Sequence, residues 1–125
     1  MKIFNFTQHA ATTAQIEAGV IDLVGDDLHE LLDILTFTSI PTSAEVQAKA
    51  KRLFKLAGKY DPSLEGHGFM IGGAPYLMAQ IPQVDKVGCF NWLFAYSERV
   101  SVEQEVNGEV VKTSVFNHAG FVPLY

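Results

Sequence analysis

A short glycine-containing segment, residues 72–75, has the composition best suited to ligand chemistry. Its sequence is Gly-Gly-Ala-Pro, and it stands between the apolar run at residues 69–71 and helix-forming residues from Tyr76 onward. Glycine permits a sharp turn and a close approach to a ligand, and proline fits the first helical position because it lacks an N–H. The free amides of Gly72, Gly73 and Ala74 and the helix dipole favour a negative charge. The segment predicts a phosphate or carboxylate site, with a tight packing turn as the alternative.

Two further polar groups stand at the ends of predicted strands. Thr7, Gln8 and His9 close a first apolar strand, and Ser97 and Arg99 follow a later buried one. Histidine suits proton transfer near neutral pH, and the arginine fork matches phosphate oxygens. The alternatives are a loop histidine bonded to backbone, hydroxyls that close turns, and an ion pair between Arg99 and a nearby acid.

The elements that would position these groups alternate along the chain. Capping-box spacing occurs at Thr12 and at Thr42, and leucines from Leu28 to Leu35 recur at helical spacing. The periodicity predicts strands over residues 2–7, 20–23, 68–71 and 90–96 and helices over residues 13–18, 26–35, 43–57 and 75–81.

The last third of the chain carries a strong hairpin signal. Two β-rich runs, residues 100–106 and 109–116, flank Asn107 and Gly108, which suit a type I′ turn. The order of elements predicts one small α/β, Rossmann-like layered domain over residues 1–125, with a mostly parallel sheet and this hairpin as an antiparallel edge. Because ligands of such sheets lie at the carboxyl ends of the strands, the three polar groups should share one crevice.

The amino-acid composition of the chain limits the kinds of partner that we expect. Nine Lys and Arg against fourteen Asp and Glu give a net charge of −5, which argues against duplex nucleic acid and anionic membrane. The basic residues around Arg52 are expected on a solvated helix face, with nucleic-acid binding as the less favoured interpretation. The single Cys89 predicts a buried thiol in a reducing compartment, and no leader or membrane span is visible, so a soluble cytoplasmic protein is expected. No zinc pattern, Walker lysine or dinucleotide fingerprint is found, and we expect no metal or cofactor.

Three motifs carry a resemblance to known proteins. They are residues 5–12, residues 70–75 and residues 94–99, which read NFTQHAAT, MIGGAP and FAYSER. With them, nearly the whole chain resembles a family of small uncharacterised bacterial and phage or plasmid proteins. In layout it is more distantly similar to CRISPR-associated Rossmann-like domains, a likeness that implies a dimer binding or cleaving cyclic oligoadenylates at its strand ends.

Two functional hypotheses follow. In the first, a nucleotide or other phosphate-bearing ligand binds Gly72, Gly73 and Ala74 amides and Thr7, Gln8 and Ser97, and metal-independent cleavage would use His9 for proton transfer and Arg99 for charge stabilisation. In the second, the protein is a non-catalytic accessory protein of a phage or mobile element. Its hairpin and its aromatic residues Trp92, Phe121 and Tyr125 then form a homodimer or partner surface.

Overall fold

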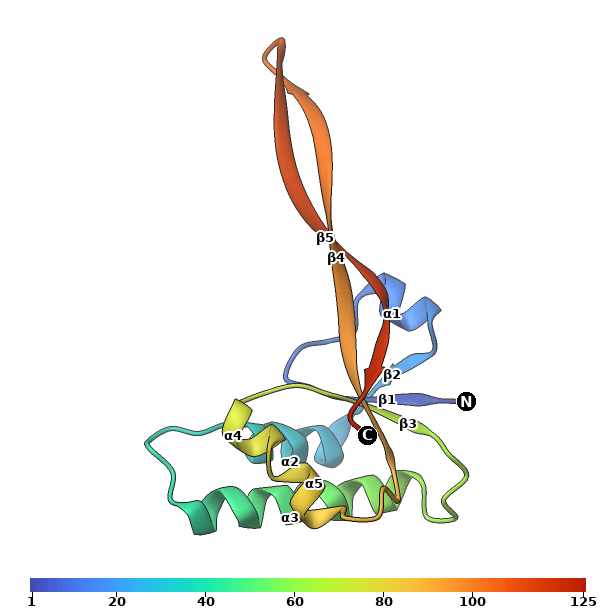
Figure 1. Ribbon diagram of the computed structural model, residues 1–125, viewed down its shortest axis with the longest axis vertical. Coiled ribbons are helices and arrows are strands. Elements are labelled where there is room, and N and C mark those ends of the chain that lie inside the picture. The colour runs from blue at the N-terminus through green and yellow to red at the C-terminus, as the bar shows by residue number, and fades with distance from the viewer.

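The computed structural model describes residues 1–125, and ten elements alternate along them (Figure 1). They are β1 (Ile3–Phe6), α1 (Thr13–Glu17), β2 (Val20–Asp22), α2 (Gly25–Leu35), α3 (Ser43–Tyr60), β3 (Gly68–Ile71), α4 (Pro75–Met78), α5 (Ile81–Val84), β4 (Asn91–Val106) and β5 (Glu109–Pro123). Each predicted strand and helix has a counterpart, but the helix predicted over residues 75–81 is divided in two, and the strand predicted over residues 90–96 continues into the hairpin.

The five strands form one sheet in the order β2-β1-β3-β4-β5. β1 pairs in parallel with β2 and β3, and β3 pairs in parallel with β4, whereas β5 is antiparallel to β4. The predicted mixed α/β domain with a mostly parallel sheet and an antiparallel hairpin is therefore confirmed. Strand order reverses beside β1, because β2 lies on one side of it and β3 on the other.

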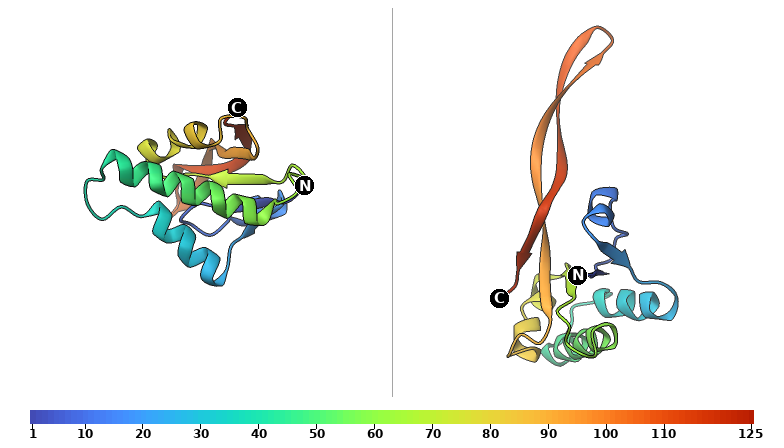
Figure 2. Two further views of the ribbon diagram at one scale, coloured as in Figure 1. Left: turned by 90° about the horizontal axis from the view of Figure 1, so that it is seen from below. Right: turned by 90° about the vertical axis from the view of Figure 1, so that its right-hand side faces the viewer.

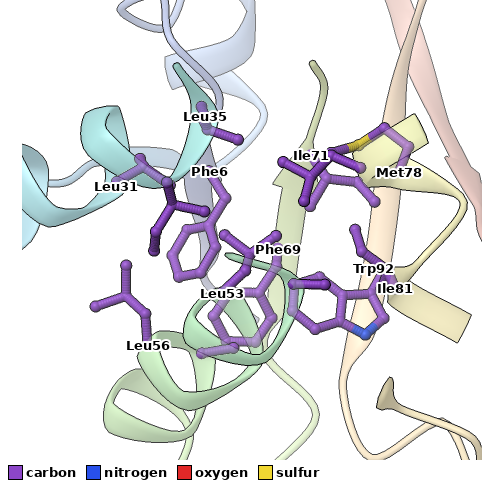
Figure 3. Close-up of a cluster of buried hydrophobic side chains, with 14 of the residues drawn as sticks. Phe6, Leu31, Leu35, Leu53, Leu56, Phe69, Ile71, Met78, Ile81 and Trp92 are labelled. Carbon is purple, nitrogen blue, oxygen red and sulfur yellow. The ribbon is translucent and has the colours of Figure 1, made fainter. Parts of the chain in front are cut away.

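One face of the sheet is covered by α2, α3, α4 and α5, and α1 lies on the other side beside the hairpin (Figures 1 and 2). Alternate strand residues enter the main core from the helix-covered face (Figure 3). Phe6, Phe69, Leu53 and Leu31 are fully buried there. The opposite face holds a cluster of only three buried residues, Ile3, Val20 and Met70. Most of the helical residues therefore lie on one face of the sheet.

The basic residues of α3 contact the acidic residues of α2. Arg52 Nη2 lies 3.0 Å from Glu30 and 2.8 Å from Asp33, and Lys59 Nζ lies 2.7 Å from Asp27. Hydrogen bonds from Lys59 and from the Tyr60 hydroxyl lower the pKa of Asp27. Part of the basic face of α3 is therefore paired with acidic side chains of α2.

The third group of predicted site residues lies inside a strand and does not follow one. Residues 97–99 are not a loop, because the predicted strand at residues 90–96 and the first arm of the hairpin are one continuous strand, β4. Its partner β5 likewise runs to Pro123, with an irregularity in pairing at Tyr96 and Ser97. The turn itself is confirmed, with φ of 54° at Asn107 and 80° at Gly108.

Two other expectations were wrong. The helix predicted over residues 75–81 is interrupted, giving the four-residue helices α4 and α5, and α3 continues past Gly58 to Tyr60. Trp92 is not a surface aromatic residue. It is 1% exposed, and its indole N–H donates to the buried carboxylate of Asp85 at 2.7 Å.

Candidate functional site

A cavity of about 350 Å³ opens at the carboxyl ends of β1 and β3, where strand order reverses. It is formed by the loop after β1, the start of α1, the end of β3 with the glycines after it, and one residue of β4. Its lining residues are Thr7, Gln8, His9, Ala10, Thr12, Gln15, Met70, Ile71, Gly72, Gly73 and Ala95.

Asn5, in β1, fixes the loop that forms one wall. Its side chain is 4% exposed; its Nδ2 donates to the His9 carbonyl and to Asp22 Oδ1, both at 2.8 Å. Its Oδ1 accepts from the Thr7 amide at 3.0 Å and from the Thr7 hydroxyl at 2.6 Å. Asp22 also accepts from the Ala11 amide at 3.0 Å. Because these bonds join two neighbouring strands to both ends of the loop, the loop is held in one conformation.

The start of α1 forms the adjacent wall. Thr12 Oγ1 accepts from the Gln15 amide at 3.2 Å, and Gln15 Oε1 accepts from the Thr12 amide at 3.0 Å. This is the reciprocal cap predicted from the spacing. Both side chains that line the cavity from α1 are therefore fixed by their own capping bonds.

The glycine segment forms the wall opposite. Gly73 has a φ of +154°, a conformation that side-chain-bearing residues rarely adopt, and a Cβ there would lie 3.6 Å from Leu35 and Met78. A Cβ at Gly72 would lie 3.5 Å from the Thr7 side chain. The two glycines thus let the chain pass between the core and the Thr7 loop.

Five of the residues that line this cavity have a main-chain N–H group without an acceptor in the chain. The amides of Gln8, His9, Ala10, Gly72 and Gly73 donate to no backbone or side-chain acceptor of the chain. Folded proteins leave few main-chain N–H groups unpaired where water cannot reach them. The unpaired amides of these lining residues can therefore donate to a ligand or to solvent. His9 is the only titratable residue among the eleven lining residues, and no Lys or Arg is included.

The structure brings together five of the eight predicted site residues, namely Thr7, Gln8, His9, Gly72 and Gly73. Gln8 also anchors its loop to α2, because its Nε2 donates to the Leu35 carbonyl at 3.1 Å. Ala74 is the N-cap of α4 and does not line the cavity.

Ser97 and Arg99 do not line the cavity either. Ser97 pairs with His118 and Arg99 with Phe116 in the long hairpin. The Arg99 guanidinium carbon lies 5.4 Å from the centre of the Phe116 ring. Its fork therefore has an intramolecular partner in the hairpin.

Sequence reasoning missed Asn5, Asp22, Thr12, Gln15 and Ala95. A usable signal existed for the first two, because an amide inside an apolar strand and a carboxylate at the end of the next strand have to find polar partners when the strands pair. Ala95 gave no signal, since only the strand register places it at the cavity.

Two other candidate reactive groups are better explained by their structural surroundings. Asp61, Glu65 and His67 offer ligand atoms within 4.8 Å of one another, but Asp61 accepts the amides of Glu65 and Gly66 at 2.7 and 3.2 Å and so closes its own turn. Burial and the neighbouring Asp85 carboxylate raise the pKa of the Cys89 thiol, which disfavours the nucleophilic thiolate.

Comparison with known proteins identifies a family along almost the entire chain. The description of that family is "Uncharacterized protein MJ1673 family", and it matches residues 1–122. The chain belongs to the MJ1673 family. This agrees with the expected likeness to an uncharacterised family and gives no support to a link with phage proteins or CRISPR-associated domains. No curated protein and no solved structure matches the chain. None of its helices has the length and apolar character needed to span a membrane.

Proposed function

We propose that the cavity between β1 and β3 binds a small anionic ligand, a nucleotide or another phosphate-bearing molecule, through main-chain amides. The observation that carries the proposal is the gathering of unpaired N–H groups from Gln8, His9, Ala10, Gly72 and Gly73 at one cavity. Its place supports the proposal as well, because open sheets bind ligands at the carboxyl ends of their strands where strand order reverses.

The charge around the cavity favours a ligand with few negative charges. No Lys or Arg lines it, and the chain has a net charge of −5. Amide dipoles stabilise a single phosphodiester or carboxylate well, but a triphosphate needs cations or a metal ion. α4, with only four residues, adds little helix dipole. We therefore expect a cyclic nucleotide or cyclic dinucleotide to bind better than ATP.

A thermal-shift panel tests this proposal with inorganic phosphate, AMP, ATP, cyclic AMP and a cyclic dinucleotide. A ligand that binds only the folded state raises the unfolding temperature with concentration. We expect a rise of several degrees with a cyclic nucleotide and a smaller one with ATP. No response to any member of the panel would contradict the proposal.

Ala95→Phe is the decisive variant. Ala95 lies on an exposed part of β4, so phenylalanine suits the strand while its ring occupies the cavity. It should abolish the shift, whereas Ala48→Phe, on an exposed position of α3, should keep it. Arg99→Ala is included because Arg99 is predicted to counter ligand charge. A lost response in that variant would extend the site into the hairpin.

Cleavage of a bound phosphodiester is the catalytic form of the same proposal. His9 would move the proton, as the only titratable side chain at the cavity. Incubation with the cyclic nucleotide that shifts the unfolding temperature, followed by chromatography of the products, tests it. Turnover that disappears in His9→Ala while binding persists supports catalysis, and unchanged ligand after long incubation assigns the cavity to binding alone.

A further inference from the structure

The hairpin of β4 and β5 leaves the body of the protein as a free two-stranded ribbon (Figures 1 and 2). β3 pairs with β4 only from Asn91 to Phe94, so residues 97–118 pair only with one another. At about 3.3 Å per residue, the ten residues from Ser97 to Val106 extend about 33 Å. An isolated hairpin is marginally stable in water, so a ribbon of this length needs a partner surface.

One face of the ribbon is apolar. Strand alternation and register place Val100 opposite Val115, Val102 opposite Thr113, and Gln104 opposite Val111, all on the same face. Val106 completes it near the turn. We call Val100, Val102, Val106, Val111 and Val115 the valine face. Val100, Val111 and Val115 remain 37–40% exposed and Val106 48% exposed, although they are neighbours on one surface.

The other face has partners within the ribbon. Glu103 stands directly opposite Lys112, and Arg99 lies over the ring of Phe116. Opposite charges across a strand pair stabilise each other, and the cation lies on the aromatic ring. Val110 and Phe116, each 68% exposed, also lie on this face, but two serines and the Glu103 and Lys112 pair stand between them. The valine face is therefore the longer continuous apolar stripe.

The charge of the ribbon limits the kind of partner that it can bind. Residues 97–118 carry four Glu against Arg99 and Lys112, so an acidic ribbon is repelled by nucleic acid and by anionic membrane. The valine face itself carries no charged residue, and the two acids on that side of the ribbon, Glu98 and Glu109, stand at its two ends. An uncharged stripe of valines is complementary to itself. It therefore fits a second copy related by a two-fold axis.

We propose that the valine face packs against the valine face of a second copy of this chain, so that two ribbons form a small β-sandwich. Sheets pack about 10 Å apart with their apolar side chains interdigitated. A ribbon about 33 Å long and about 10 Å wide covers about 330 Å² of its partner, against roughly 800 Å² per partner in a standard interface. The dimer should consequently be weak and depend on concentration.

Sedimentation equilibrium of the full chain, from low micromolar to millimolar concentration, tests this interface. The wild type should move from monomer to dimer within that range. Val111→Lys places a charge in the valine face of both copies and should weaken the dimer roughly 100-fold. Ser101→Lys is the matched control, because it adds the same charge at an exposed position of the other face and should leave the dimer unchanged.

Trp92 separates loss of association from loss of folding. It is the only tryptophan and lies in the core of the body, so its fluorescence reports the fold independently of the ribbon. Three outcomes would overturn the proposal: a wild type that stays monomeric, a Val111→Lys variant that dimerises as the wild type does, and equal weakening by both lysine variants.

Discussion

The cavity beside β1 and β3 and the ribbon of β4 and β5 differ in the kind of group that each leaves without a partner. At the cavity the unpaired groups are main-chain amides, and the apolar side chains of the same strands are buried beneath it. On the ribbon every strand residue is paired across the hairpin, but valines remain exposed. Unpaired amides suit a ligand that accepts hydrogen bonds, whereas exposed apolar side chains suit contact with another protein surface. The two proposals therefore place small-molecule binding and association in separate regions of the molecule.

The largest expected effect is in the body, where Leu53→Ala empties a fully buried position under the sheet. Such substitutions cost about 2–5 kcal/mol of unfolding free energy because transfer and cavity terms add. Val115→Ala, on the ribbon, should cost less than about 0.5 kcal/mol in dilute monomer, since that side chain is exposed. Urea unfolding followed by Trp92 fluorescence measures both. Similar losses at the two positions would mean that the ribbon is packed in the monomer.

Asn5→Ala should have the next largest effect, and it acts on the cavity. It removes the acceptor of the Thr7 amide and the donor to the His9 carbonyl in a buried position, costing about 1–3 kcal/mol. The loop would then lose its fixed shape, so ligand-induced stabilisation should disappear as well. Asp22→Asn is the control, because its side-chain oxygen can still accept from Asn5 and Ala11. A stable Asn5→Ala variant with normal ligand response would show that the network does not shape the cavity.

Shortening the ribbon should change stability little while abolishing association. Removing residues 102–113 and joining Ser101 to Ser114 through an Asn-Gly turn preserves the pairing of those two serines. Since the removed residues touch no core residue, the unfolding temperature of dilute protein should stay within about 2–3 °C of the wild type. Calorimetry and sedimentation of the same sample report both quantities. A large fall in unfolding temperature would make the ribbon part of the body.

The sequence was most informative where local chemistry determines the structure. The capping box at Thr12, the turn at Asn107 and the glycine conformation at Gly73 all follow from residue types over a few positions. For the same reason the polar ends of β1 and β3 could be predicted to meet, since parallel strands bring their carboxyl ends to one edge.

The predictions that were wrong depended on contacts between residues far apart in the sequence. Nothing in residues 97–99 shows that the strand continues, because the bases and acids there resemble a loop until β5 is laid beside them. The second hypothesis places Trp92 on a partner surface, whereas its indole N–H bonds to the buried carboxylate of Asp85, which belongs to a different segment. Asn5 lies within the strand predicted over residues 2–7, and its partner Asp22 comes beside it only when β2 pairs with β1.

The smallest predicted effect lies in the helical layer, far from both regions, and depends on pH. Burial and the hydrogen bond to Asp27 raise the pKa of Tyr60 to about 12 from its ordinary value of 10.0. The unfolded chain then loses this proton at lower pH than the folded chain does. The contribution of Tyr60 to stability is therefore complete below pH 10.0 and declines as pH rises toward about 12.

Tyr60→Phe should make that alkaline decline shallower, and Tyr76→Phe, an exposed tyrosine, should leave it as in the wild type. The hydroxyl also helps to lower the pKa of Asp27. Stability that depends on this carboxylate is present above pH 3.8 and is lost below it, so Tyr60→Phe should reduce acid sensitivity as well. Unfolding temperature measured across both pH ranges, in dilute protein without ligand, checks the two slopes. Because neither the cavity nor the ribbon contacts Tyr60, ligand response and dimerisation should be unchanged at neutral pH, and a change in either would couple these regions to the helical layer.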